Sequence, residues 1–310
     1  MKSSLTIRNA EVVLLGGIEK TDVSVKNGVI NAIGSEIPNV GEVIDAEGLL
    51  LIPGVIDPQV HFREPGANHK EDLHSGSCAA AAGGVTSFLD MPNNNPPITT
   101  RKRMDEKKQL AAEKSVVNYG FFIGATPQNL EELNAVENVC GIKIFMGAST
   151  GDLLVEDPET LESIFANGTK LIAVHAEDES ILKANRILMK GIDDVRIHSR
   201  IRDESAALSS TKLAVRLSNK YQRRLHILHL TTEEECDFLR TLSREHHISA
   251  EVCPQHLVLS SPECYEQLGT KAQMNPPIRS KRHKVALWKA LKDGIIDCIA
   301  TDHAPHTLEE

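Results

Sequence analysis

The strongest constraint on the fold is an alternation of apolar runs and helix-like segments, which begins near residue 50 and continues almost to residue 310. Eight apolar runs have the length of strands: residues 50–62, 84–92, 118–126, 141–147, 171–178, 224–231, 248–256 and 295–305. Helix-like segments lie between them at 70–82, 100–115, 128–137, 158–167, 203–220, 232–245 and 284–293. Strands that are apolar on both faces and alternate with helices are typical of a parallel sheet. Eight of them predict an α/β fold of the TIM (β/α)8 barrel type, with a doubly wound sheet as the alternative.

Residues 1–50 have a different pattern, with short alternating strands joined by Gly and Asn turns. Asn27-Gly28 is a typical two-residue hairpin turn. We therefore expect a small β subdomain at 1–50 and a barrel at 51–310. The eighth apolar run ends close to Glu310, so we expect a barrel that lacks its last helix. We also expect a β subdomain that is incomplete without a C-terminal continuation.

The composition of the chain argues against several classes of partner and location. The chain has 34 Lys+Arg against 43 Asp+Glu, a net charge of -9, which argues against nucleic acid as a partner. No stretch approaches the roughly 20 apolar residues of a membrane span. The six cysteines are scattered without a CxxC pair, and the N-terminus lacks a signal-peptide pattern. These features predict a cytoplasmic protein with reduced cysteines and a small-molecule substrate.

Polar residues gather where the predicted strands end, which is where TIM-barrel chemistry takes place. They are Gln59, His61, Arg63, Asp90, Asn93, Lys143, His175, His229, Gln255, His256 and Asp302. A single histidine at a strand end is more often structural than a ligand, a lysine such as Lys143 can extend to the barrel mouth, and Asp302 could cap a helix. Their coincidence at one end of the barrel instead predicts a metal site.

Histidine and carboxylate ligands with one open position suit Zn²⁺. A bound metal lowers the pKa of its water to about 7 and polarises a carbonyl group. A nearby aspartate can then accept the proton of the water and pass it to a leaving nitrogen. Lys143, in an otherwise apolar strand, could carry a CO₂-derived carbamate and so become an anionic oxygen ligand.

The motifs also support a family resemblance. They are DPQVHFREPG (57–66), MPNNNPP (91–97), KIFMG (143–147), HAED (175–178), HILHLTT (226–232), MNPPIR (274–279) and ATDHAPH (300–306). In this order and over nearly the whole chain, they resemble the amidohydrolase superfamily and, within it, the class I-like dihydroorotases.

The resemblance implies roles for individual residues. The metal ligands would be His61, His175, His229, Asp302 and a carboxylated Lys143, with Asp302 also acting as general acid and base. The substrate-binding residues would be Arg63, Asn93, Asn275 and His306. His226 lies three residues before His229, and strand alternation predicts that it faces the opposite side and is structural. We expect the histidines outside the strand ends to be solvated: His69, His198, His246, His247 and His283.

One position departs from the family pattern, because its HxH motif here is Gln59-Val60-His61. A neutral amide oxygen is a poor ligand for Zn²⁺. The resemblance implies one or two zinc ions, and this departure at Gln59 favours one.

Three readings of function remain open. The first is a dihydroorotase, which interconverts dihydroorotate and N-carbamoyl-aspartate in pyrimidine biosynthesis. The second is a hydantoinase, dihydropyrimidinase or allantoinase, and Arg63 argues against it because those rings carry no carboxylate to bind. The third is a non-catalytic, dihydroorotase-like scaffold for a transcarbamoylase partner, which Gln59 favours and the full set of ligands disfavours. A homodimer is compatible with all three.

Overall fold

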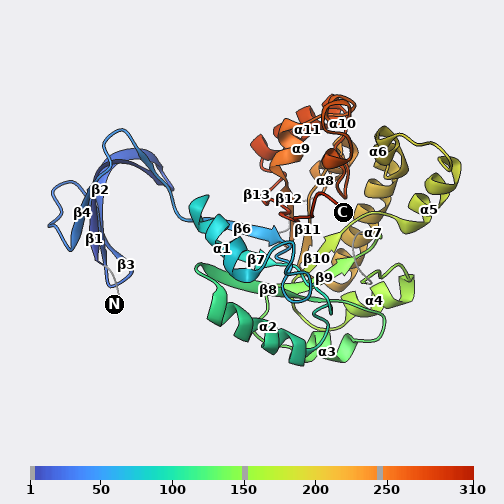
Figure 1. The fold of residues 1–310 in the computed structure, drawn as a ribbon, viewed down its shortest axis with the longest axis horizontal. Coiled ribbons are helices and arrows are strands. Elements are labelled where there is room, and N and C mark those ends of the chain that lie inside the picture. The colour runs from blue at the N-terminus through green and yellow to red at the C-terminus, as the bar shows by residue number, and fades with distance from the viewer. Residues whose placement is uncertain (1–3, 149–152, 243–246) are drawn as a thin grey trace. The chain divides into compact units, whose positions relative to one another are not determined.

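The computed structural model describes residues 4–148, 153–242 and 247–310. They form two compact units, Met1–Val55 and Ile56–Glu310 (Figure 1). The first unit is a sheet with the strand order β3-β2-β1-β4, and β5 also pairs with β1. Its strands are β1 (Leu5–Leu14), β2 (Gly17–Lys26), β3 (Val29–Gly34), β4 (Glu42–Asp45) and β5 (Leu50–Leu51).

The predicted hairpin at Asn27-Gly28 is confirmed. It joins β2 to β3, and both residues have positive φ, 56° and 79°. A type I′ turn requires this backbone at both central positions, and Asn and Gly adopt it most readily.

The second unit is built on eight parallel strands that follow one another in chain order around the sheet, from β6 to β13. They are β6 (Val55–Val60), β7 (Val85–Asp90), β8 (Asn118–Gly124), β9 (Gly141–Phe145), β10 (Ile172–His175), β11 (Leu225–Ile227), β12 (Ile248–Val252) and β13 (Cys298–Ile299). Two contacts join the segment after the last strand, β13, to the first strand, β6, at the seam of the barrel. Val60 forms a parallel β-bridge with His303, and the backbone N–H of Asp302 donates to Gln59 O at 3.0 Å. The predicted TIM barrel is confirmed.

Helices surround this sheet (Figure 1). They are α1 (Leu73–Ala82), α2 (Arg101–Lys114), α3 (Leu130–Ala135), α4 (Pro158–Ala166), α5 (Glu179–Leu188), α6 (His198–Ile201), α7 (Glu204–Tyr221), α8 (Glu233–Arg240), α9 (Pro254–Val258), α10 (Glu263–Leu268) and α11 (Lys281–Lys292). Alternate strand residues such as Leu225 and Ile227 pack with Val215 of α7 and Leu239 of α8 in the main apolar core. None of the described helices is long and apolar enough to cross a membrane.

The structure differs from the sequence prediction in several elements. Helix α5 was not predicted; Asp178 caps it by accepting hydrogen bonds from the backbone of Ser180 and Ile181. Helices α9 and α10 were also missed, being too short to show a helical period. Strand β11 ends at Ile227 rather than at residue 231, which moves His229 out of the strand.

Candidate active site

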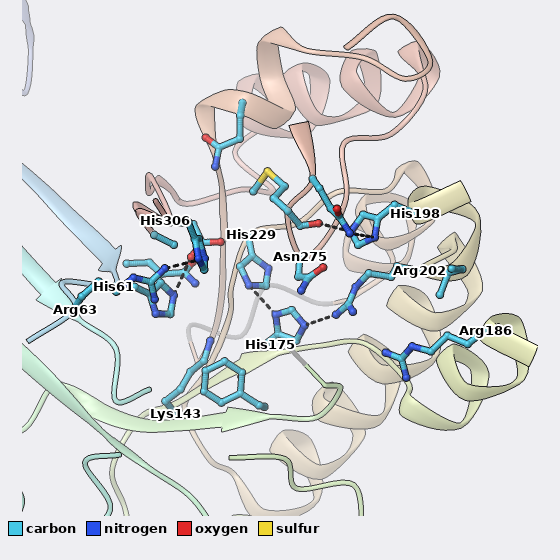
Figure 2. A pocket seen from close by; sticks show the side chains of 18 residues that line it. His61, Arg63, Lys143, His175, Arg186, His198, Arg202, His229, Asn275 and His306 are labelled. Atoms are coloured by element: carbon cyan, nitrogen blue, oxygen red, sulfur yellow. Dashed lines mark hydrogen bonds and ion pairs between the residues drawn. The ribbon is translucent and has the colours of Figure 1, made fainter. Parts of the chain in front are cut away.

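A cavity of about 580 Å³ opens at the carboxyl ends of the barrel strands (Figure 2). All of the predicted site residues except Asn93 line it: His61, Arg63, Lys143, His175, His229, Asn275, Asp302 and His306. Gln59 lines it as well. The barrel thus brings together side chains that are far apart in the sequence.

His61 and Asp302 form one pair in this cavity. Their Nε2 and Oδ1 atoms are 2.9 Å apart, and both side chains are nearly buried. The other ring nitrogen of His61, Nδ1, donates to Asn93 Oδ1 at 2.5 Å. Nε2 therefore faces the Asp302 carboxylate at hydrogen-bond distance.

His175 and His229 form a second pair, with Nδ1 of His175 3.1 Å from Nε2 of His229 (Figure 2). Burial lowers the pKa of both imidazoles, that of His229 well below its usual value, so both rings are neutral at pH 7. Nε2 of His175 donates to Glu177 Oε2 at 2.8 Å. Glu177 thereby keeps the His175 proton on Nε2 and leaves the Nδ1 lone pair free.

The charges of Glu177 and Asp302 depend on their neighbours. Burial would raise the pKa of Glu177, but the hydrogen bond from His175 and the charge of Arg202 lower it to about 2. Burial would likewise raise the pKa of Asp302, and the hydrogen bond from His61, with nearby positive charge, lowers it to about 2. Both carboxylates are ionised at neutral pH.

Lys143 lies on β9 with a side chain that is 1 % exposed. Within the described ranges no carboxylate lies within ion-pair distance of its ammonium, which sits 4.5 Å from the centre of the Phe145 ring. Burial lowers the pKa of Lys143 to about 7. A large fraction of this side chain is therefore a neutral amine near physiological pH.

These side chains fit a divalent metal. The two nitrogens of the His175–His229 pair have the separation expected of ligands on one ion with bonds of about 2.0–2.1 Å. The buried Nδ1 of His229 and Oε1 of Gln59 have no hydrogen-bond partner in the described part of the chain. The predicted ligands lie as two pairs rather than as one tight cluster, with Lys143 lining the same cavity.

A different trio has its ligand atoms all within 4.8 Å of one another, namely His226, Glu251 and Cys298. Both ring nitrogens of His226 are already engaged, with Glu251 Oε2 at 2.9 Å and Ser249 Oγ at 2.8 Å. Burial raises the pKa of the Cys298 thiol to about 12, so it stays protonated. We interpret this trio as a structural network; His226 does not line the cavity.

Arg63 occupies the cavity wall near the seam. Its Nε donates to Pro305 O at 3.0 Å, and its Nη2 donates to His306 Nε2 at 3.1 Å. Among the described residues it has no carboxylate partner, although it is only 7 % exposed. The charges of Asp90, Asp302, Glu71 and Glu310 act on the guanidinium from beyond ion-pair distance and favour its charged form. A nearly buried guanidinium with no direct ion pair is suited to an anionic ligand. Asn275, across the cavity, has a buried Oδ1 with no hydrogen-bond partner in the same ranges (Figure 2).

Asn93 lies elsewhere than expected. It is absent from the cavity lining, and its side-chain oxygen holds His61 Nδ1 instead. The structure therefore supports a role in orienting a predicted ligand rather than direct contact with substrate.

Two residues of the site have strained backbones. His229 and Asp302 have φ values of 35° and 51°, in a region that residues other than Gly rarely adopt. Such strain is common where side chains are held for function. His229 lines the cavity and His226 does not, in line with the opposite facing expected from strand alternation.

Sequence reasoning missed several polar residues of the site: Glu177, Arg186, His198 and Arg202. Arg202 binds Glu177 through Nε at 3.0 Å, and His198 Nε2 donates to Met274 O at 2.8 Å. The spacing of Glu177 two residues after His175 was a usable signal, since such residues share a face in extended chain. The others lie on helical or loop segments without such a signal.

The expectation of solvated histidines was wrong for His198, which lines the cavity, and for His283, which is fully buried. His283 Nε2 donates to Glu204, and its Nδ1 accepts from the backbone of Glu233. His69 is exposed, and His247 is partly exposed and bonded to Asn219. His246 lies outside the described residues.

Comparison with known proteins agrees with this architecture. Residues 50–308 match the amidohydrolase family. The chain is 38% identical to the dihydroorotase of Methanosarcina acetivorans, over 98% of this chain and 68% of that one. It is 32% identical to the allantoinase of Bacillus velezensis, over 98% of this chain and 69% of that one. The L-hydantoinase (dihydropyrimidinase) of Arthrobacter aurescens superposes with a TM-score of 0.94 at 28% identity, over 100% of this chain and 71% of that one. The chain belongs to the amidohydrolase family.

Proposed function

We propose that this chain is a metal-dependent cyclic amide hydrolase, a dihydroorotase, which interconverts dihydroorotate and N-carbamoyl-aspartate in the cytoplasm during pyrimidine biosynthesis. The observation that carries the proposal is the nearly buried Arg63, which lines the cavity without a carboxylate partner among the described residues. Dihydroorotate has a carboxylate that a guanidinium can bind through two parallel hydrogen bonds. The rings of hydantoin, dihydrouracil and allantoin have none.

The relatives support the same choice. Dihydroorotases from Methanosarcina acetivorans and Methanosarcina mazei are 38% and 36% identical to this chain. Two other dihydroorotases are 31% identical and three allantoinases are 32–33% identical, so the support comes from the most similar relatives and not from a clean separation. The strong structural likeness to hydantoinases reflects a shared family architecture, which does not determine the substrate.

The metal that the proposal requires would be Zn²⁺, held by His61, His175, His229, Asp302 and a modified Lys143. When bound, it would lower the pKa of a water molecule and polarise the ring carbonyl. Gln59 replaces a charged or imidazole donor with a neutral amide oxygen. For this reason we propose one ion per chain rather than two.

Lys143 would carry a CO₂-derived carbamate. The nitrogen of a neutral amine bonds to the carbon of CO₂, the nitrogen releases a proton to water, and an anionic carbamate remains. The burial of Lys143 and its pKa of about 7 support this step, because the neutral amine is the reactive form.

Asp302 would move the proton. As an ionised carboxylate facing the cavity, it would accept the proton of the attacking water and donate it to the departing ring nitrogen. Arg63 would hold the substrate carboxylate from the seam side, and Asn275 and His306 would contact the ring or the carboxylate. His306 Nε2, which accepts from Arg63, would fix the guanidinium in place.

The test compares Arg63→Met with the wild type on dihydroorotate and on dihydrouracil. Loss of a charge-assisted bidentate contact should lower kcat/KM for dihydroorotate by roughly 10- to 150-fold, from about 1.5–3 kcal/mol of lost binding. Any slow hydrolysis of dihydrouracil should be nearly unchanged. Arg216→Met, at an exposed position of α7, is the matched control and should change the hydrolysis of neither dihydroorotate nor dihydrouracil. An equal loss on both substrates in Arg63→Met would contradict the proposed substrate.

A further inference from the structure

Lys107 is among the largest fully buried side chains of the described structure, and it does not line the cavity. It lies in α2, which packs against β8 on the outside of the barrel (Figure 1). Its Nζ forms an ion pair with Asp90 Oδ2 at 2.5 Å and donates to Asn94 Oδ1 at 2.6 Å. The ammonium is also 5.0 Å from the centre of the Phe121 ring. The contact with Asp90 is an ion pair by distance, without hydrogen-bond geometry at Oδ2, whereas the contact with Asn94 is a hydrogen bond.

Asp90 and Asn94, the two partners of Lys107, in turn form hydrogen bonds with the backbone on either side of Arg63. The other oxygen of Asp90, Oδ1, accepts from the backbone N–H of Phe62 at 2.9 Å. The amide nitrogen of Asn94 donates to Phe62 O at 3.2 Å and to Glu64 O at 2.9 Å. The backbone is therefore held on both sides of Arg63 by two side chains that meet at one ammonium.

We propose that Lys107 is a positioning residue for the substrate-carboxylate contact. It orients Asp90 and Asn94, these hold the backbone at Phe62 and Glu64, and the held backbone sets the direction in which Arg63 enters the cavity. This inference rests on the proposed function, because it assigns Arg63 to substrate binding. The competing explanation is that the ion pair only stabilises the fold.

Lys107→Met tests the proposal, because methionine has a similar length and no charge. We expect kcat/KM for dihydroorotate to fall by roughly 10- to 100-fold, mainly through KM, since a displacement of about 1 Å in a positioned group has effects of this size. Hydrolysis of dihydrouracil should change much less. Lys108→Met is the matched control, because this neighbour in α2 is partly exposed and bonds to Glu137 O on the surface. Lys108→Met should have the wild-type kcat/KM for dihydroorotate and the wild-type rate of dihydrouracil hydrolysis.

A second variant covers the case in which Lys107→Met does not fold. Lys107→Met/Asp90→Asn leaves no unpaired buried charge and keeps an oxygen that can accept from Phe62 N–H. We expect this double variant to fold and still to lose selectivity for dihydroorotate over dihydrouracil, because the ammonium that orients both side chains is gone. Wild-type selectivity in a folded double variant, or an equal loss on both substrates, would overturn the proposal.

Amide hydrogen exchange separates this inference from the proposed function. The Phe62 amide should exchange at least about tenfold faster in the double variant than in wild type or Lys108→Met, because its acceptor is no longer fixed. Unchanged exchange at Phe62 would refute the role of Lys107 whatever the substrate. If the wild type does not hydrolyse dihydroorotate while Phe62 exchange responds as expected, the proposed function fails and the positioning of the Arg63 backbone stands.

Discussion

His61 Nε2 lies 2.9 Å from Asp302 Oδ1, across the seam where the first and last strands of the barrel meet. Asp302 N–H also donates to Gln59 O, two residues before His61, so the contact that closes the barrel also assembles one half of the site. In the other half, His175 is the last residue of β10 and His229 follows the neighbouring strand β11. Both pairs lie where parallel strands bring their carboxyl ends together.

Asp302→Asn should retain most of the bound metal and lose roughly 10²- to 10⁴-fold in kcat, because an amide cannot carry the proton. Metal content and kcat measured on the same preparation test this expectation. Complete loss of metal would mean that Asp302 acts chiefly as a ligand, and a nearly unchanged kcat would assign the proton transfer to another group.

His229→Ala and His175→Ala should each remove most of the bound metal. His226→Ala should retain the metal and lower the free energy of unfolding by about 1–3 kcal/mol, because Oε2 of the buried Glu251 carboxylate loses its donor while Oε1 keeps the His229 N–H. Metal analysis and urea unfolding of the three variants give both quantities. If His226→Ala lost the metal and His229→Ala retained it, His226 would be the ligand and His229 the structural residue.

Glu177→Gln should weaken metal binding by roughly 10- to 100-fold, because a neutral amide holds the His175 proton on Nε2 less firmly. It also removes the partner of Arg202. Competition with a metal chelator measures the affinity, and Glu159→Gln, at an exposed position of α4, is the control. Equal affinities in the two variants would show that Glu177 supports only the fold.

Lys143→Ala should lose most activity and regain part of it when short carboxylic acids are added, because their oxygens can replace those of the carbamate. Chloride salts at the same ionic strength are the control and should restore nothing. A metal-loaded crystal of the wild type should show a branched extension on Nζ. A bare ammonium in an ion pair there would refute the modification.

Part of the cavity lining could be predicted because residues such as His61, His175 and Asp302 lie at or just after the end of an apolar strand, and strand ends are a local property of the sequence. The contact of Asn93 with His61 could not be predicted, because the motif that contains Asn93 shows proximity to the site and not which neighbour its side chain contacts. His283 was misjudged because a helix position alone does not show burial; its partners come from α7 and α8, far away in the chain.

The sequence by itself determined the alternation of strands and helices, the hairpin at Asn27-Gly28 and the set of side chains at the strand ends. These depend on periodicity and turn chemistry, which act over a few residues. Only the tertiary structure decided how the set is arranged: His61 lies against Asp302, and His175 lies between Glu177 and His229. It also decided that Lys107 lies against Asp90 and Asn94. These contacts join distant segments, and their distances follow from barrel closure and from the pairing of buried charges, which no local pattern encodes.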